Sequence, residues 1–549
     1  MCSYNRINQT YGCQNSKTLN GLLKGELGFQ GYVVSDWYAT NAGVAGVLAG
    51  QDMDQPGNNH LDYSTTTGPS LFGSNLTLAV QNGSVPISRV DDMVTRILTP
   101  YFYLGQDADD YPLIDPSSAE LGGFDASTSY TQWPIGGEKH RDVRGNHAKL
   151  IREIGAAAIT LLKNSNGILP LKTPPKVIGV FGNDAADFSE GLYAPPVAYN
   201  IGTLAAGGGS GGGRFTYVVS PLDAIKQWAK QSNSLVQYIT SNSVVLNDAS
   251  GGFATSGILT DIYPIPDVCF VFLKYYVAEG PDHSDFDLNN NGTGFINAVA
   301  SQCSNTIVVT HAGSPTSMSW ADHENVTAIQ SGNAIIDVLS GAYNPSSKLP
   351  FTVAYNASDY NVAVTNFTAL NNSQWGQELN FTEGLAIDYR HFDSAGIQPR
   401  YEFGFGLSYT TFNITSLKVT SIGSKPFPFP PATAEVVPGG NQALWDDLVS
   451  VTFTVKNTGS IDGATVPQLY LSFPESTSPA DTPVQVLRGF SKIHLPAHSA
   501  KIVSFKLQRR DLSFWNVTAQ DWQIPTGAFL VKLGLSSRDI QQTQTIMIL

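Results

Sequence analysis

The sequence predicts a multidomain α/β protein that ends in a β-sandwich, and two stretches of the chain carry this prediction. Between residues 176 and 341, short apolar runs such as VIGVF and VCFVF alternate with amphipathic segments such as PLDAIKQWA. This alternation is typical of a layered parallel sheet covered by helices. From about residue 400, short alternating strands follow one another between Pro and Gly turns, without helices. That pattern predicts a sandwich of the immunoglobulin or fibronectin III type.

The N-terminal segment predicts further strand–helix units. Residues 16–28 predict a helix with Leu19, Leu22, Leu23 and Leu27 on one face. Residues 31–35 (GYVVS) predict a short apolar strand, and residues 75–105 predict further helix. Asp36 and Trp37 follow the strand directly. The carboxyl ends of parallel strands carry the chemistry in β/α barrels, and a carboxylate beside an indole suits a sugar substrate. The alternative interpretation is that Asp36 caps the next helix and Trp37 belongs to the core.

Composition excludes several classes of protein. The 549 residues carry a net charge of −14, which argues against a nucleic-acid partner. The sequence contains no run of 18 apolar residues, so no membrane span is predicted. Residues 1–25 lack the apolar core of a signal peptide. N-x-S/T sequons, whose density favours a secreted glycoprotein, occur at Asn8, Asn75, Asn82, Asn291, Asn325, Asn356, Asn366, Asn371, Asn380, Asn413 and Asn516.

The four cysteines do not resemble a metal site. Cys2 and Cys13 flank a turn, and they could form a disulfide in an oxidising compartment. Cys269 and Cys303 lie in or beside apolar strands, where a disulfide and two buried thiols are both open interpretations.

Several segments together resemble glycoside hydrolase family 3, and specifically its fungal secreted β-glucosidases. They are MCSYN, GFQGYVVSDW and AGVLAGQDMDQPG near the N-terminus, followed in family order by RGNHAKLIREIGAAAITLLKNSNGILPL, SGNAIIDVLSGAYNPSSKLPFT, IDYRHFD and PRYEFGFGLSYTTF. The resemblance covers nearly the whole chain.

The resemblance implies a domain order. Residues 1–105 would be the C-terminal part of a (β/α)8 barrel, residues 106–145 a linker, residues 146–398 an α/β sandwich domain and residues 399–549 a fibronectin III-like β-sandwich. Because a barrel of this kind needs about 250 residues, we expect the chain to be N-terminally truncated. The arginine and the Lys-His pair that hold the sugar in the family would then precede Met1.

The resemblance also implies the catalytic pair of a retaining glycosidase. Asp36 matches the family nucleophile, and Glu279 in AEG matches the general acid/base on the second domain. Without the resemblance, Glu279 could not be chosen over the acidic neighbours Asp282, Asp285 and Asp287, and a solvated acidic loop would be the favoured interpretation.

Four further residues match family positions around the sugar. Met1 and Tyr4 would lie close to it, Trp37 would form a wall of the leaving-group subsite, and Ser210 would reach it from the second domain. The alternative for Ser210 is a flexible loop, because it lies in GGGSGGG. We interpret Asp52 and Asp54, in QDMDQPG, as structural.

Two departures from the family pattern stand out. Pro281 and His283 occupy positions where an aromatic and a basic residue are common, which affects how the substrate is positioned. After NVTAI the chain continues directly with QSGN, so that roughly eight residues are missing relative to the family; we therefore expect one central strand of the second domain to be lost, at a heavy cost in packing.

The implied function is a β-glucosidase that releases terminal β-D-glucosyl residues from β-glucosides or cello-oligosaccharides in cellulose breakdown. We expect this chain, if truncated, to be poorly active. No cofactor or metal is expected, because two carboxyl groups and water suffice for the reaction. We further expect a secreted, N-glycosylated protein without nucleic-acid or membrane partners, with a homodimer left open. The alternatives are a non-catalytic carbohydrate-binding or cell-wall protein and a β-xylosidase of the same family.

Overall fold

The computed structural model describes residues 1–57, 70–113, 138, 141–189, 202–210, 215–246, 259, 262–279, 285–331, 334–362 and 380–549. Most of the predicted linker, the sequons at Asn366 and Asn371, and the residues Pro281, Asp282 and His283 lie outside these ranges. The chain forms two compact units, Met1–Gly145 with Phe429–Asp446, and Asn146–Pro428 with Asp447–Leu549. No helix in the described part of the chain is both long and apolar enough to cross a membrane.

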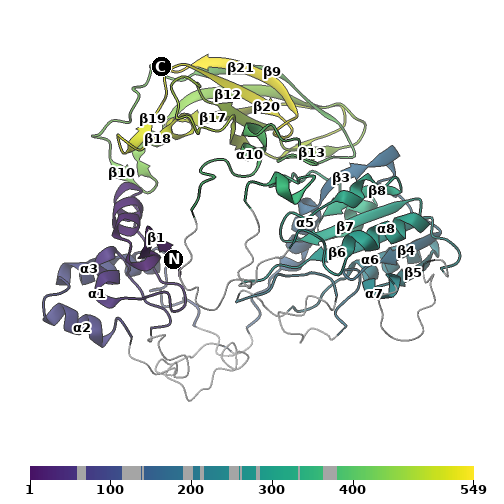
Figure 1. Ribbon diagram of the computed structural model, residues 1–549, viewed down its shortest axis with the longest axis horizontal. Coiled ribbons are helices and arrows are strands. Elements are labelled where there is room, and N and C mark those ends of the chain that lie inside the picture. The colour runs from purple at the N-terminus through teal and green to yellow at the C-terminus, as the bar shows by residue number, and fades with distance from the viewer. Residues whose placement is uncertain are drawn as a thin grey trace. The chain divides into compact units, whose positions relative to one another are not determined.

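The first unit is mainly helical, and it appears in purple in Figure 1 apart from its short green insertion. Its elements are β1 (Arg6–Ile7), β2 (Thr10–Tyr11), η1 (Gly12–Gln14), η2 (Lys17–Glu26), α1 (Gly43–Ala49), α2 (Ser74–Gln81), α3 (Ile87–Tyr103), β10 (Val436–Val437), β11 (Gly440–Asn441) and η9 (Gln442–Trp445). The insertion is held by a hydrogen bond of 2.8 Å from the Gly439 N–H to the Leu27 carbonyl.

Three extended segments of this unit run parallel to one another. Isolated parallel bridges join Cys2 to Ser35 and Val34 to Met53. The predicted strand at 31–35 is therefore the middle segment, although its pairing is limited to these bridges. Consecutive parallel segments joined by helical connections are the repeating unit of a β/α barrel. Asp36 follows the middle segment at its carboxyl end.

The predicted helix at 16–28 is a π-helix, η2, rather than a regular amphipathic α-helix. Its C-terminal bond runs from the Leu27 N–H to the Leu22 carbonyl, which is an i→i+5 pattern. This wider winding spreads the leucines around the axis, so Leu19 is buried while Leu22 and Leu27 are exposed. The prediction of one shared leucine face was wrong for this reason. The predicted helix at 75–105 is two helices, α2 and α3, separated at Asn82–Pro86.

Asp52 anchors the parallel segments, which agrees with its interpretation from the sequence as a structural residue. Its fully buried carboxylate accepts from Lys24 Nζ at 2.8 Å and from Arg89 Nη2 at 2.7 Å. The other oxygen accepts from the Val33 N–H at 2.7 Å. Burial lowers the pKa of Lys24, and the hydrogen bond with Asp52 opposes that shift. Asp52 thus ties η2 and α3 to the segment that leads to Asp36.

Replacing Asp52 with asparagine should lower the free energy of unfolding of the first unit by about 3 kcal/mol, because both cations then lose their buried counter-charge. Hydrogen exchange of peptides from η2 and α3 in increasing urea measures the change. The exposed Asp91 of α3 provides the matched control, Asp91→Asn. Equal protection in both variants would contradict the anchoring role.

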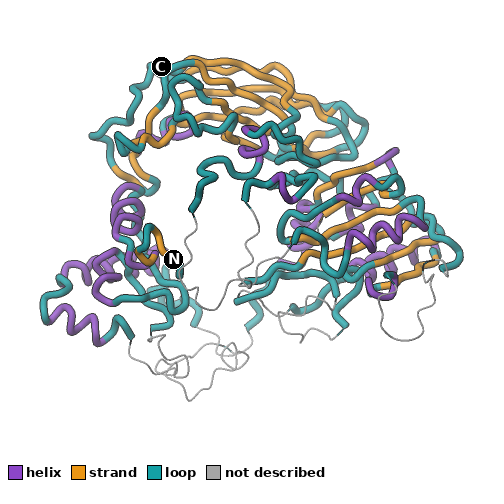
Figure 2. Tube along the Cα trace, in the orientation of Figure 1, coloured by secondary structure: helices purple, strands orange, loops and turns teal. Residues whose placement is uncertain are grey.

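The second unit begins with an α/β sandwich built on one six-stranded sheet, whose strands are orange in Figure 2. Its elements are α5 (His147–Ala158), β3 (Thr160–Asn164), η4 (Ser165–Gly167), β4 (Val177–Phe181), α6 (Pro221–Ala229), η5 (Lys230–Ser232), β5 (Leu235–Ile239), α7 (Asn242–Val245), β6 (Val268–Tyr275), α8 (Gly292–Gln302), β7 (Thr306–Ala312), η6 (Ser319–Asp322), β8 (Val326–Ser331), α9 (Ile335–Leu339), η7 (Ala357–Asp359) and α10 (Tyr389–Ser394). The strand order is β3-β8-β7-β6-β4-β5.

Two features of this sheet correct the predictions. The sheet is mixed rather than wholly parallel, because β3 pairs antiparallel with β8. The expected loss of a central strand is also wrong. The segment VTAIQS itself forms β8, which pairs with β7 on one side and with β3 on the other. The sheet is therefore continuous across the site of the deletion.

Both faces of the sheet are buried, which explains the continuous apolar runs of its strands. In β6, Val271 and Leu273 pack with α8, whereas Phe270 and Phe272 pack in the core that contains residues of α5, α6 and α9. Cys269 and Cys303 form a disulfide in the first of these cores, and Cys2 and Cys13 form the other disulfide. For Cys269 and Cys303 the sequence left open a disulfide or two buried thiols, and the structure has the disulfide.

The C-terminal part of the second unit is the predicted β-sandwich. Its strands are β9 (Phe412–Ser421), β12 (Asp447–Asn457), β13 (Gly463–Thr465), β14 (Gln468–Ser472), β15 (Val486–Phe490), β16 (Ile493–Leu495), β17 (Ala500–Gln508), β18 (Phe514–Asn516), β19 (Asp521–Gln523), β20 (Ala528–Gly534) and β21 (Ile540–Met547), with the turn η10 (Arg509–Leu512). The main sheets, β17-β12-β9 and β15-β14-β20-β21, enclose one apolar core. Alternating buried residues along β12 and β20 produce the sequence periodicity.

Candidate active site

Asp36 is held by donors from two of the parallel segments. Its N–H donates to the Cys2 carbonyl at 2.7 Å, which places the carboxylate beside residues 3 and 4. The Tyr4 hydroxyl donates to Oδ1 and the Ser3 hydroxyl to Oδ2, each at 3.1 Å. The Trp37 N–H donates to Oδ1 at 2.7 Å. These donors orient the half-buried carboxylate and leave part of its acceptor capacity for a ligand.

The contact between Tyr4 and Asp36 brings together two residues that the sequence predicted for one site. Ser3 was missed, although its position beside Tyr4 at the end of the neighbouring segment could have indicated it. Met1, Tyr4 and Trp37 are 76%, 54% and 50% exposed, so each offers apolar surface to solvent. The Trp37 ring meets the Tyr38 ring edge-on, with centroids 6.1 Å apart. Exposed aromatic faces beside a carboxylate fit a sugar ring, which stacks its apolar face on such surfaces.

The structure distinguishes Asp36 from Asp52 and Asp54 by their partners. The Asp52 carboxylate is buried in ion pairs with Lys24 and Arg89. The Asp54 carboxylate accepts a hydrogen bond from the Ser70 hydroxyl at 3.1 Å. Asp36 does not act as a helix cap either, because the next helix, α1, has Ala42 at its N-cap. The capping alternative raised by the sequence is therefore wrong.

Glu279 lies on the extension of β6, and the Gly/Ser tract pairs with it directly. Gly208 and Ala278 form a parallel bridge, in which the Gly208 N–H donates to the Val277 carbonyl at 3.0 Å and the Glu279 N–H donates to the Gly208 carbonyl at 3.2 Å. The Ser210 N–H donates to Glu279 Oε2 at 2.6 Å. Ser210 and Glu279 are both exposed, so this pair stands at the surface of the second unit.

The glycines of this tract permit the close approach. Gly209 adopts φ +113°, and a Cβ there would lie 2.4 Å from Glu279 Cβ and 2.8 Å from Oε2. A Cβ at Gly208 would collide with the Tyr276 hydroxyl. Only glycine fits both positions. Residues 207–210 are thus a fitted cradle for Glu279, and the interpretation of Ser210 as part of a flexible loop does not describe them.

The acidic neighbours of Glu279 that the structure describes take part in loop geometry. Asp287 Oδ1 accepts from the Thr293 hydroxyl at 2.6 Å and from the Leu288 N–H at 2.9 Å. Asp285 Oδ1 accepts from the Asp287 N–H at 2.9 Å. Asp285 and Asp287 therefore organise the connection from β6 to α8.

Asp184, Lys274 and His311 form a buried polar cluster that was not predicted from the sequence. His311 at the end of β7 contacts Asp184 through Nδ1 and Oδ2 at 2.5 Å, and both side chains are nearly inaccessible. Lys274 in β6 donates to the carbonyl of Gly202, which begins the described segment that leads to Ser210. Burial lowers the pKa of Lys274 from its ordinary value to about 8, while Asp184 raises it.

The pKa of Lys274 makes the stability of the second unit depend on pH. Between pH 8 and 10.5 the unfolded state binds more protons than the folded state, so the contribution of Lys274 to stability rises with pH. We compare the free energy of unfolding of the wild-type protein with that of Lys274→Met. When the pH is raised from 7.5 to 9.5, this difference should shift in favour of the wild-type protein by about 2 kcal/mol. Urea unfolding of both proteins across this range measures the difference. A constant or shrinking difference would contradict a depressed pKa.

Within the described residues, no group of His, Cys, Asp and Glu is arranged to hold a metal ion. Each unit carries one candidate carboxylate, Asp36 in the first and Glu279 in the second, and each has its own hydrogen-bonded surroundings.

Residues 159–409 match the family model described as Glycosyl hydrolase family 3 C-terminal domain, and residues 465–537 match Fibronectin type III-like domain. The chain is 50% identical over 560 residues to Probable beta-glucosidase G of Emericella nidulans, covering 100% of this chain and 66% of the relative. Beta-D-glucoside glucohydrolase from Trichoderma reesei aligns with a TM-score of 0.84 and 36% identity, over 100% of this chain and 73% of that chain. Beta-glucosidase 3B from Thermotoga neapolitana, solved in complex with α-D-glucose, aligns with a TM-score of 0.73 and 25% identity, over 99% and 70%.

The fold and these similarities agree on one family. The chain belongs to glycoside hydrolase family 3, and it spans 66% of the length of the curated relative from Emericella nidulans.

Proposed function

We propose that the chain acts as a retaining β-glucosidase, with Asp36 as the nucleophile and Glu279 as the general acid/base. The observation that carries this proposal is that Asp36 and Glu279 are each oriented by neighbouring hydrogen-bond donors. Each also lies on a segment that resembles its family counterpart. The name of the relative from Emericella nidulans and the glucose bound to the Thermotoga enzyme support glucose as the sugar that is released. Cellobiose and related β-glucosides are the proposed substrates.

The reaction proceeds by double displacement. An oxygen of Asp36 attacks the anomeric carbon, the bond from that carbon to the glycosidic oxygen breaks, and Glu279 donates its proton to the leaving oxygen. Glu279 then takes a proton from water, whose oxygen attacks the anomeric carbon and releases Asp36. The proposal requires the two carboxyl groups to lie about 5–5.5 Å apart during the reaction.

The surrounding residues receive positioning roles. Tyr4 and Ser3 orient Asp36 through their hydroxyl groups, and Trp37 and Met1 contribute apolar surface to the sugar subsites. Ser210 orients Glu279 through its N–H, and its hydroxyl would bind the substrate. Residues 1–105 would be the barrel part that carries the nucleophile, residues 146–398 the α/β sandwich domain that carries the acid/base, and residues 399–549 the fibronectin III-like sandwich domain. We also propose that the protein is secreted and carries N-glycans, for which Asn8, with its exposed side chain, is one acceptor.

The stereochemistry of hydrolysis tests this proposal. Proton NMR of the reaction with an aryl β-D-glucoside should show β-glucose as the first product, before mutarotation. Initial release of α-glucose would contradict a covalent intermediate at Asp36. A faster reaction with the corresponding aryl β-xyloside would favour the xylosidase alternative.

Replacing Gly209 with alanine should lower kcat by about 10²-fold, because the added Cβ displaces Glu279 from its cradle. Steady-state kinetics on an aryl β-glucoside measures the effect. The matched control is Gly83→Ala in the first unit, since Gly83 also has a positive φ, +79°, but has no atom within 4 Å of the added Cβ. Equal activity of the two variants would contradict the role of the cradle.

A further inference from the structure

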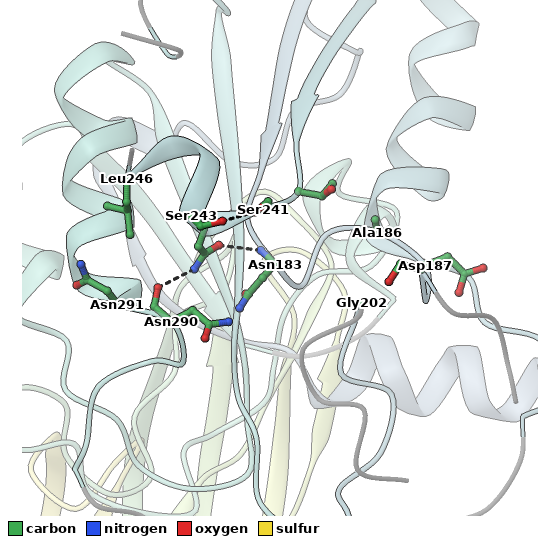
Figure 3. A pocket seen from close by; sticks show the side chains of 12 residues that line it. Asn183, Ala186, Asp187, Gly202, Ser241, Ser243, Leu246, Asn290 and Asn291 are labelled. Atoms are coloured by element: carbon green, nitrogen blue, oxygen red, sulfur yellow. Dashed lines mark hydrogen bonds between the residues drawn. The ribbon is translucent and has the colours of Figure 1, made fainter. Parts of the chain in front are cut away.

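A cavity lies at the carboxyl edge of the α/β sheet. It has a volume of about 710 Å³ and is lined by Asn183, Ala186, Asp187, Ser189, Gly202, Thr240, Ser241, Asn242, Ser243, Leu246, Asn290 and Asn291. Neither Glu279 nor Ser210 is among these residues. In Figure 3, Asn183 stands in the middle of the labelled residues, with Leu246, Asn290 and Asn291 on one side and Ala186, Asp187 and Gly202 on the other.

The topology of the sheet favours a ligand at this place. Strand β4 lies between β6 and β5, so the chain leaves β4 toward β5 and then returns to β6 on the opposite side. Such a reversal of strand order opens a crevice at the carboxyl ends, where α/β proteins bind ligands. The cavity is lined by residues that follow β4 and β5 and by the connection from β6 to α8.

Asn242 holds the three connections together. Its Oδ1 accepts from the Asn183 N–H at 3.0 Å, and its Nδ2 donates to the Asn290 carbonyl at 3.2 Å. The Ser241 and Ser243 hydroxyls pair with each other at 2.9 Å on the same wall (Figure 3). The cavity is therefore braced by side-chain hydrogen bonds, and Asn242 is already satisfied by them.

Asn183 is the exception among these polar groups. Its side chain is only 7% exposed, and neither its Oδ1 nor its Nδ2 has a hydrogen-bond partner among the described residues. A buried amide without partners destabilises a fold by roughly 1–3 kcal/mol. An amide that lines a polar cavity and lacks partners is explained when a ligand supplies both an acceptor and a donor.

The lining selects the chemistry of that ligand. Amide and hydroxyl groups provide paired donors and acceptors, which match the hydroxyl groups of a sugar. No Lys or Arg is among the described lining residues, and the charged side chain there is the carboxylate of Asp187. An anionic ligand such as a phosphate or a sugar acid is therefore disfavoured, because its charge would be repelled without compensation.

We propose that this cavity is a second binding site for a neutral saccharide, with Asn183 as its buried hydrogen-bonding residue. The inference goes beyond the proposed function, because binding here requires neither Asp36 nor Glu279. The absence of aromatic rings among the described lining residues means that hydrogen bonds, rather than stacking, determine the affinity.

Hydrogen exchange measured by mass spectrometry with D-glucose as the probe tests the proposal. Protein made without N-glycans is used, because Asn291 in the cavity wall begins an N-x-T sequon. Saturating glucose should slow exchange in peptides covering residues 182–189 and 240–246, and D-glucuronate at equal concentration should not. Asn183→Leu should weaken the glucose effect about tenfold, while thermal stability stays equal or rises, since an unpaired buried amide has been removed.

The matched control is Thr316→Val. Thr316 is also a buried side chain of the second unit whose hydroxyl has no partner among the described residues, and it lines a different cavity. This variant should keep the glucose-dependent protection at 182–189. The proposal is overturned if glucose gives no protection there, or if a folded Asn183→Leu protein retains it in full. Because the readout is exchange and not hydrolysis, its failure is separable from a failure of the β-glucosidase proposal.

Discussion

Replacing Asp36 with asparagine should lower kcat on an aryl β-glucoside by roughly 10⁴-fold or more, as loss of the nucleophile does in other hydrolases. The amide retains the size of the side chain: its oxygen can still accept from the Tyr4 hydroxyl, and its NH2 group can donate to the Ser3 hydroxyl, so the fold of the first unit should survive. It cannot form the ester that the first displacement requires. Michaelis–Menten kinetics of the purified variant measures the effect.

Asp91→Asn is the control for this experiment, because Asp91 is an exposed carboxylate of the same unit. Its activity should equal that of the wild-type protein. An Asp36→Asn protein that keeps more than about one hundredth of wild-type activity would place the nucleophile elsewhere.

Replacing Glu279 with alanine should produce a loss that depends on the leaving group. With cellobiose, whose leaving sugar needs a proton, kcat should fall by about 10²–10⁴-fold. With 2,4-dinitrophenyl β-glucoside, whose leaving group departs without protonation, the first displacement should be nearly unaffected and the second should become limiting. Added azide should then restore turnover and yield β-glucosyl azide, because azide attacks the intermediate without a general base.

The matched control for Glu279 is Glu324→Ala, which removes an exposed glutamate from the same unit. It should show equal activity on both substrates and no response to azide. A uniform loss on cellobiose and on the dinitrophenyl glucoside, without rescue by azide, would show that Glu279 supports the structure and is not the acid/base.

Much of the fold could be predicted from periodicity. The alternation of apolar and polar residues along β12 and β20 reflects one buried face, and the continuous apolar run of β6 reflects burial on both faces. The antiparallel placement of β3 could not be predicted in this way, because a buried strand has the same composition in either direction. The π-helical winding of η2 could not be predicted, because leucine spacing does not distinguish i→i+5 hydrogen bonding from that of an α-helix.

The candidate site was predicted through resemblance more than through local chemistry. Asp36 could be suspected from its position after a strand, but Glu279 was one acid among several in its loop. The structure distinguishes them by partners, since Asp287 is bound within the loop while Glu279 lies against the backbone of Gly208 and Ser210. A glycine tract looks flexible in sequence, and only the neighbouring Glu279 and Tyr276 explain why Gly209 and Gly208 must lack a Cβ.

The buried groups Asp184, Lys274 and His311 carried no sequence signal. His311 and Lys274 are each a lone titratable residue within an apolar run, and their convergence on Asp184 and Gly202 depends on pairing between β4, β6 and β7. Asn183 was missed for the same reason, because its unpartnered amide is evident only when the ends of β4 and β5 are placed around it.

Covalent trapping of the glycosyl-enzyme is the most direct test of the central claim. The chain is incubated with 2,4-dinitrophenyl 2-deoxy-2-fluoro-β-D-glucoside, digested with pepsin and sequenced by tandem mass spectrometry. The account predicts one fluoroglucosyl group per chain, attached to the side chain of Asp36 and absent from Asp36→Asn. No label on the wild-type protein, or a label on a different carboxylate, would contradict the assignment of this chain as a retaining glucosidase with Asp36 as its nucleophile.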